Sequence, residues 1–299
     1  MAANRKYGYF AIISAMVLWS VSFIWSKIAL DTYNPFTILF FRIFIAASSL
    51  FIVSKVFGVL QKIEKKDYKY FLLFSFFEPF LYFIGENFGL QHVSASTASI
   101  IISTIPLFLP FIGLMFFNEK LRRNNLLGIF ISFIGVLFIV LNQDLSISGE
   151  IKGFSFLFLA VFSAVAYTAV IKKVTYKYNA FTIVVWQNII ASMAFFPFFL
   201  YFDFHEFKEI GITSDFWYIA LLGIIASNLA FLFYTYAFRF FRVSQIGIFT
   251  NLIPLLTIII SFFVFDEIPD TKKYIGVILV ILGLFIAEFK KPKYDGIIE

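Results

Sequence analysis

The chain has 299 residues, of which 61% are hydrophobic, 22% aromatic and only 14% charged. Soluble domains are nearer half apolar and a quarter charged, so this composition, with a mean hydropathy of +0.91, excludes an ordinary soluble protein. The absence of cysteine excludes disulfides, thiol catalysis and cysteine metal sites, and the two histidines have no suitably spaced partners for a metal. We therefore expect no metal and no cofactor. The net charge of +6 does not indicate nucleic-acid binding either, since no loop carries an arginine-rich patch.

Apolar runs about as long as a bilayer-crossing helix, roughly 20 residues, follow one another from end to end. The runs are continuous rather than alternating, which argues against a β-barrel. The sequence therefore predicts an all-α polytopic membrane protein with ten transmembrane helices. These cover about 8–29, 36–56, 70–91, 95–117, 125–142, 153–172, 180–202, 216–238, 244–265 and 273–289.

The loop charges predict the orientation of these spans. With the N-terminus in the cytoplasm, most of the 24 basic residues fall in cytoplasmic loops or at the cytoplasmic termini. The external loops then hold only Lys152, Lys208, Lys272 and Lys273. Because cytoplasmic loops are enriched in Lys and Arg, we expect both termini to be cytoplasmic.

The two halves of the chain resemble each other. The segment "GYFAIISAMVLWSVSFIWSKIALDTYNPFTI" from Gly8 aligns without a gap with "GFSFLFLAVFSAVAYTAVIKKVTYKYNAFTI" from Gly153. The alignment predicts a first repeat over 1–147 and a second over 148–299, each with five spans. Because five is odd, the second repeat must enter the membrane inverted, and inverted repeats place a site near the bilayer midplane. Matched pairs include Lys27 and Lys172, Tyr33 and Tyr178, Asn34 and Asn179, Thr37 and Thr182, Glu119 and Glu267, Gly128 and Gly276, and Gly135 and Gly283.

Several of these features together resemble the EamA family of the drug/metabolite transporter superfamily. They are the two five-span halves, "LWSVSFIWSK" in the first span, Arg42 in the second, a proline midway along the fourth and a glutamate that ends it. The resemblance covers nearly the whole chain and implies a bacterial or archaeal inner-membrane carrier, often an exporter of amino acids or other metabolites. The second half departs from the pattern, since Trp19 aligns with Ala164 and Arg42 with Gln187.

The third span carries the polar groups that most need an explanation. On an ideal helix Glu78, Tyr82, Gly85 and Gly89 fall in one narrow stripe, with Glu86 at its edge. Ionisable groups inside a membrane are costly and usually face a cavity or a partner. This stripe therefore predicts a cavity wall, and we expect the third span to bend at Pro79.

The two glutamates allow different roles. Glu86 and Arg42 lie at similar predicted depths, roughly 9 Å at 1.5 Å per residue, so Glu86 either forms a structural ion pair with Arg42 or contacts substrate. Glu78 has no basic residue at matching depth in the neighbouring spans. It suits proton coupling or binding of a cationic group, and a structural role is the alternative.

Other residues extend this predicted site. Trp19 and Ser22 share a face of the first span, where they either contact substrate or pack against a helix, and Asn228 and Tyr234 lie near the equivalent depth in the second repeat. Pro79, Pro106 and Pro254 are predicted hinges. Glu119 and Glu267 should brace helix ends. The fifth and tenth spans lack ionisable groups and have glycines seven residues apart, which predicts a close-packed scaffold or a contact in a homodimer.

These observations predict a secondary transporter in the bacterial or archaeal cell membrane. It would move a small metabolite, an amino acid or an amphipathic or aromatic solute that is neutral or cationic, by alternating access and in the export direction. Its partners would be that substrate and the lipid bilayer, without nucleic acid. An intramembrane enzyme, a membrane receptor or assembly protein, and a channel are the alternatives.

Overall fold

A computed structural model describes residues 2–117, 123–140, 151–241, 246, 249–250, 252–266 and 271–288. Every regular element within these ranges is helical. The first-half elements are α1 (Ala2–Thr32), α2 (Pro35–Val56), η1 (Lys65–Asp67), α3 (Tyr68–Ser75), η2 (Phe76–Leu81), α4 (Tyr82–Leu90), α5 (Ala95–Ile102), α6 (Ile105–Phe117) and α7 (Arg123–Val140). The second-half elements are α8 (Ile151–Val174), α9 (Ala180–Phe198), η3 (Phe199–Asp203), α10 (Phe204–Ile210), α11 (Phe216–Leu221), η4 (Leu222–Ala230), α12 (Phe231–Ala237), α14 (Leu252–Phe265) and α15 (Thr271–Glu288).

Six predicted spans are long and apolar enough to cross a membrane, which confirms the polytopic class. They are Lys6–Thr32, Pro35–Val56, Ala95–Phe116, Ile151–Val174, Ala180–Ile210 and Phe216–Ala237. The fifth, ninth and tenth predicted spans contain the shorter apolar helices Leu126–Phe138, Leu252–Phe265 and Tyr274–Gly283. The third is divided among α3, η2 and α4. Glu119 and Glu267, the predicted braces, lie outside the described residues.

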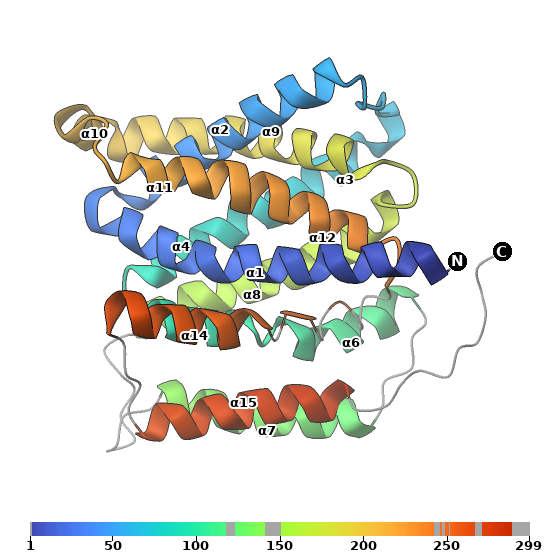
Figure 1. Cartoon of the computed structure of the whole chain (residues 1–299), viewed down its shortest axis with the longest axis vertical. Helices are drawn as coiled ribbons and strands as arrows, with labels where there is room; N and C mark the ends of the chain where they lie inside the picture. The colour runs from blue at the N-terminus through green and yellow to red at the C-terminus, as the bar shows by residue number, and fades with distance from the viewer. Residues whose placement is uncertain are drawn as a thin grey trace.

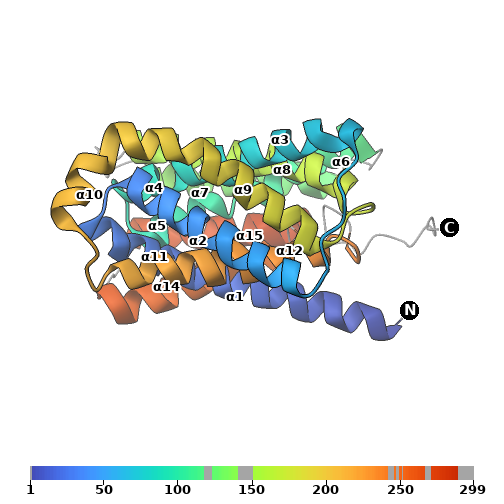
Figure 2. The ribbon, with the colours of Figure 1, turned by 90° about the horizontal axis from the view of Figure 1, so that it is seen from above.

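The helices lie roughly side by side, with most connections at the two ends of the bundle (Figures 1 and 2). Helix α1 begins and α15 ends at the same end, while α10 lies at the opposite end (Figure 1). The side of the membrane on which each terminus lies stays a prediction.

Helices α7 and α15 form a pair at one edge of the molecule (Figure 1). A Cβ on Gly135 would lie 2.7 Å from the Gly276 carbonyl oxygen, and one on Gly283 would lie 2.5 Å from that of Gly128. The glycine faces of the two helices are therefore packed against each other within one chain. A homodimer would have to use another face.

Contacts between the halves follow the predicted repeat. Equivalent spans contact each other in three places, α2 with α9, α5 with α14 and α7 with α15. The third span contacts the sixth, through α4 and α8. In the same way the first span contacts the eighth, through α1 and the pair η4 and α12. Two repeats related by a two-fold axis would make such paired contacts, and both the repeat layout and its inverted orientation remain predictions.

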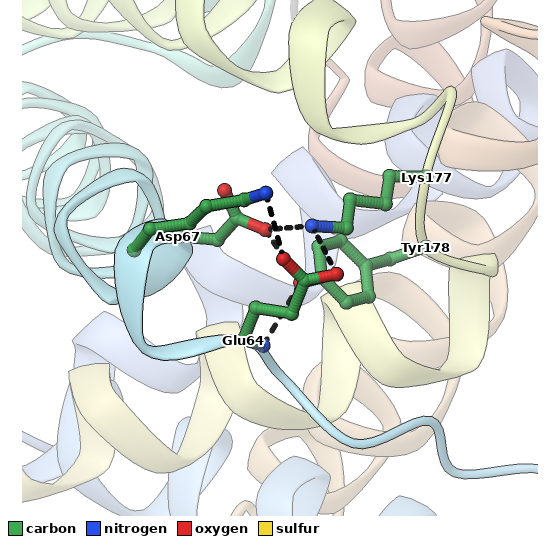
Figure 3. A network of polar contacts seen from close by, with 5 residues as sticks. Glu64, Asp67, Lys177 and Tyr178 are labelled. Carbon is green, nitrogen blue, oxygen red and sulfur yellow. Dashed lines mark hydrogen bonds and ion pairs between the residues drawn. The ribbon is translucent and has the colours of Figure 1, made fainter.

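A loop clasp joins the halves (Figure 3), at the end of the bundle where α1 begins (Figure 2). We call it the 59–67 clasp, because the turn between α8 and α9 holds residues 59–67. Tyr178 accepts a hydrogen bond from the Glu64 backbone at 3.1 Å and donates one to the Asp67 carboxylate at 2.7 Å. Lys177 lies 2.7 Å from Glu64 and 2.5 Å from Asp67. Its hydrogen bonds lower the pKa of both carboxyl groups, and the two carboxylates raise the pKa of Lys177.

A second clasp lies at the other end and uses the aligned residues of the first repeat. In this 203–213 clasp, Tyr33 accepts a hydrogen bond from the Thr213 backbone at 2.9 Å and contacts the Gly211 carbonyl at 3.1 Å. The Thr37 backbone donates to Asp203 at 2.7 Å. The matched Thr182 accepts from the backbone of Gln61 at 2.9 Å in the 59–67 clasp. The matched tyrosines Tyr33 and Tyr178 thus accept equivalent hydrogen bonds at opposite ends of the bundle, and the matched threonines also contact the two loops, though in different ways.

Candidate functional site

The third span is interrupted where the sequence predicts a bend. Glu78 has φ −144° and ψ 120°, a non-helical conformation directly before Pro79, and the π-helical turn η2 surrounds it. The predicted bend is therefore confirmed. The eighth span has a longer π-helical stretch, η4, around Ala226, the repeat mate of Glu78. No proline marks that second interruption, so the sequence pattern did not reveal it.

A small cavity of about 50 Å³ lies between the two halves beside these interruptions. The structure brings six of the seven predicted site residues to its wall, together with the predicted ion-pair residue Arg42. The six are Trp19, Ser22, Glu78, Tyr82, Glu86 and Tyr234.

Arg42 is the largest fully buried side chain among the described residues, 1% exposed. Its Nε donates to the Ser227 hydroxyl at 2.8 Å, and its guanidinium lies 3.8 Å from the centre of the Phe83 ring. Its Nη1 lies 3.8 Å from Oε2 of Glu86, so the predicted pair does form. That separation is too long for a hydrogen bond. Neither Nη1 nor Oε2 has a hydrogen-bond partner in the structure.

Glu78 is the second acidic group on the wall. It is only 6% exposed, and its side chain has no hydrogen bond or ion pair within the described part of the chain. The cavity therefore combines one guanidinium with two carboxylates, and only the guanidinium is firmly held by neighbouring side chains. A buried charged group that lacks a close partner is costly unless something else satisfies it.

Aromatic rings form much of the remaining wall. The Trp19 ring lies 4.8 Å from that of Tyr234 and 5.1 Å from that of Phe231. The indole Nε1 of Trp19 donates to the Ala226 carbonyl at 3.3 Å, and Ser22 donates to the Trp19 carbonyl at 2.7 Å. The polar atoms of Trp19 and Ser22 are therefore used locally. What these residues offer to the cavity is therefore mainly the aromatic ring of Trp19.

Asn228 does not belong to this site. Its amide donates to the Ala46 carbonyl and the Ser49 hydroxyl, both at 3.0 Å, and its oxygen accepts from Asn188 at 3.0 Å. In the π-helical stretch η4, side chains point in directions that differ from those of an ideal helix. The sequence argument used only the depth of Asn228 in the membrane, so it placed this residue at the cavity. Asn228 links α2, α9 and η4, and Asn188 contributes to the same link.

The two glycines of the predicted stripe also lie elsewhere. A Cβ on Gly85 would lie 2.6 Å from the Ala160 backbone nitrogen, and one on Gly89 would lie 2.7 Å from the Leu157 side chain. Both residues face α8, so the interpretation of Gly85 and Gly89 as cavity wall is wrong. Tyr82 and Glu86 of the same helix, α4, do line the cavity, so its wall is narrower than the predicted stripe. Phe83, which the stripe omitted, lines the cavity instead.

The predicted hinges lie in three different settings. Pro79 follows the break at Glu78. Pro106 is the second residue of α6, which follows an interruption of the fourth span at Ser103 and Thr104. Pro254 lies in the first turn of α14, where a proline is easily accommodated. Whether the chain moves at these positions stays a prediction.

The charges of the cavity come from the first half alone. Gln187, the mate of Arg42, accepts a hydrogen bond from Tyr167 at 3.2 Å, and Ala226 and Tyr234 align with Glu78 and Glu86. Among the described residues, no group of three or more acidic or histidine side chains could hold a metal. The charged groups of the cavity are thus distributed asymmetrically between the two halves.

Comparisons with known proteins agree over nearly the full length. The family model for the EamA-like transporter family matches residues 6–141 and 151–289. An uncharacterized transporter of Archaeoglobus fulgidus is 28% identical, covering 92% of this chain and 95% of its own. A probable amino-acid metabolite efflux pump of Escherichia coli is 25% identical, covering 96% of each chain. A solved crystal structure with 14% identity superposes with a TM-score of 0.71 over 97% of each chain, which shows the shared fold.

Proposed function

Because the chain belongs to the EamA-like transporter family, we propose that it carries a small organic solute across the cell membrane through the central cavity described above. The family match and the transporter names of its relatives point to a membrane transporter rather than an enzyme. The cavity lies between the two halves of the chain and is lined by residues of both, as a carrier with alternating access would need.

The observation that carries this proposal is the trio of buried charged side chains, Arg42, Glu78 and Glu86, on one cavity wall. Burial of an ionisable group in a membrane protein costs about 3 kcal/mol or more at mid-membrane. A purely structural scaffold needs none of the three. A binding site for a polar solute does, because the solute satisfies groups that otherwise lack close partners.

The charge balance of the cavity favours particular substrates. Two carboxylates face one guanidinium, so a neutral, zwitterionic or cationic solute fits better than an anion. The rings of Trp19, Phe231 and Tyr234 favour an apolar or aromatic portion. We therefore propose an amino acid or another amphipathic metabolite. The name of the Escherichia coli relative favours such a metabolite and an outward direction of transport.

Alternating access is supported by a pair of matched lysines. Lys27 donates to the carbonyls of Leu90 and Val93 at 2.7 and 3.1 Å, where the third span ends. Its repeat mate Lys172 donates to those of Phe238 and Phe241 at 2.5 and 2.9 Å, where the eighth span ends. The same device at opposite ends of the bundle suits a mechanism in which the two halves exchange roles.

Transport assays can test this proposal directly. The metabolites of cells with and without the protein are compared, and each solute that changes is then offered to proteoliposomes containing the purified chain. We expect saturable flux of at least one solute and a strong loss of that flux in Glu78→Gln. The matched control Asp31→Asn alters an exposed carboxylate outside the cavity and the clasps and should retain flux. Absence of saturable flux for every solute that differs would refute the carrier function.

A further inference from the structure

The helices around the cavity pack into two groups, and neither group is one half of the chain. Helix α1 of the first half packs mainly on η4, α12 and α14 of the second half. Helix α8, the repeat mate of α1, packs on α3, η2, α4, α5 and α6 of the first half. We call these two groups the α1 body and the α8 body. The first span of each repeat therefore belongs to a body formed mostly by the other repeat.

The cavity lies between the two bodies. Its wall includes Trp19, Ser22 and Tyr234 of the α1 body, and Glu86, Ser103 and Thr168 of the α8 body or the turn beside α5. At about 50 Å³ the cavity is much smaller than the roughly 300–1,000 Å³ of a typical small-molecule site. The two bodies must therefore move apart before an organic solute can enter.

Lys27 joins the two bodies at the end of the bundle where α10 lies. It is in α1, five residues and roughly 8 Å beyond Ser22 of the cavity wall. Its Nζ donates to the carbonyls of Leu90 and Val93, at 2.7 and 3.1 Å, where α4 ends. The last carbonyls of a helix lack partners within it, and a cation beside them is favourable. Opening of the cavity at this end must separate the ammonium group from these carbonyls.

Lys172 joins the two bodies at the opposite end, where α1 begins. It is in α8, four residues and roughly 6 Å beyond Thr168 of the cavity wall, and is only 7% exposed. Its Nζ donates to the Phe241 carbonyl at 2.9 Å and to the Phe238 carbonyl, just after α12 ends. Opening of the cavity at this end must break these hydrogen bonds.

The two lysines contact equivalent positions of the two repeats. The alignment that matches the third span with the eighth places Leu90 on Phe238 and Val93 on Phe241. Each lysine therefore donates to carbonyls of its own half, so neither contact joins the halves. Both contacts join the α1 body to the α8 body, because the first span of each repeat packs with the other repeat.

We infer that Lys27 and Lys172 are two latches, each of which closes one end of the cavity by holding the α1 body to the α8 body. Release of Lys27 opens the end at α10, and release of Lys172 opens the end where α1 begins. The contact between α5 and α14 is the pivot about which the bodies turn. This inference rests on the proposed carrier function and specifies the contacts that regulate access to its cavity.

The natural chain has no cysteine, so a single cysteine on the cavity wall can report access to the cavity. Ser103→Cys supplies this reporter with a change of one side-chain atom. An impermeant thiol reagent is applied to intact cells and to inverted membrane vesicles, and the labelling rate is measured from each side. A separate cysteine at Ser214, in the loop that follows α10, identifies the side that α10 faces.

The two latches should respond in opposite directions. Lys27→Met removes the ammonium group and keeps a side chain of similar shape. We expect it to raise labelling from the side that α10 faces about tenfold, the effect of a lost hydrogen bond to a charged group, without raising labelling from the other side. Lys172→Met should do the reverse. The matched control Lys173→Met alters an exposed lysine that lies over the Phe116 ring, and it should leave both rates unchanged.

A change from the same side for both lysines, equal changes from both sides, or no change for either would overturn the latches. Lys27→Gln and Lys172→Gln keep an amide donor and should show the same opposite directions with smaller effects, so the result does not depend on the folding of the methionine variants. If labelling shifts as expected but no solute is transported, the latches stand and the carrier function fails. If flux persists and labelling does not shift, only the latches fail.

Discussion

Substitution of Gly85 by alanine gives the clearest test of how the third span packs. The glycine lies in α4 directly against α8, and an added Cβ would meet the backbone of Phe156 and the Ala160 nitrogen, the latter at 2.6 Å. Ordinary contacts begin at 3.4 Å, so α4 would have to move away from α8 by roughly 0.8 Å. Backbone atoms cannot rotate away as a side-chain tip can, so the whole interface is strained.

The expected cost follows from two opposing effects. Overpacking of this kind costs typically about 1–3 kcal/mol, and a clash with two backbone atoms belongs at the upper end. Alanine gains about 1 kcal/mol over glycine as a helix former. Gly85→Ala should therefore lose about 2 kcal/mol of stability, balancing these two effects.

Thermal unfolding of the purified protein in detergent measures this loss. Gly89→Ala is the matched control, because its Cβ would meet the Leu157 side chain, whose tip can move, and it should cost clearly less. An unchanged melting temperature for Gly85→Ala, together with an altered choice of substrate, would show that Gly85 lines the cavity and that the packing argument fails.

Three further predictions concern charge. Glu78→Gln, which fixes the neutral form, should fold normally and lose gradient-driven transport in proteoliposomes, and full transport with an unchanged pH profile would leave Glu78 a structural residue. Lys177→Gln should speed hydrogen exchange in residues 59–67 at neutral pH, whereas Lys173→Gln should not, since Lys173 makes no ion pair in the described structure. In the unaltered protein the same faster hydrogen exchange should appear only below about pH 4. The clasp lowers the pKa values of Glu64 and Asp67, so these carboxylates stabilise it fully above their ordinary pKa values and lose this effect as the pH falls through the lowered ones. Finally, a single cysteine at Ser214 should react with an impermeant thiol reagent in intact cells and one at Lys62 should not; the reverse pattern would invert the predicted topology.

The sequence predicted which residues belong to the site better than it predicted the helix faces on which they lie. Burial in a membrane makes each ionisable side chain conspicuous, so Arg42, Glu78 and Glu86 could be selected without a structure. Matched depth predicted that Arg42 meets Glu86, and the helical stripe placed Glu78 on the same wall. Asn228 was placed on an ideal helix, whereas η4 alters the helical register there. Gly85 and Gly89 lie on the regular helix α4 with Tyr82, but they pack against α8, a contact that the sequence did not reveal. Of the interruptions η2 and η4, only η2 is marked by a proline.

The repeat was visible in the alignment, but the reason for its strongest matches was not. Tyr33, Thr37 and their mates Tyr178 and Thr182 carry no charge and resemble ordinary helix-end residues in sequence. The structure shows them in the two clasps, each holding a loop from the other half of the chain. Contacts over such separations in sequence leave no local pattern, so spacing within one half could not predict them.

The contacts at the two ends of the bundle are symmetric between the halves, whereas the cavity is not, and this difference bears on mechanism. The clasps and the lysine contacts occur once in each half, at opposite ends of the bundle, whereas the charged groups of the cavity come only from the first half. In the proposed carrier, equivalent ends let the cavity open to either side at similar cost in broken contacts. A charged wall on one half holds the solute in one orientation throughout. The second half, with Tyr234 in the place of Glu86, then offers a neutral aromatic surface that can move past the solute without separating an ion pair.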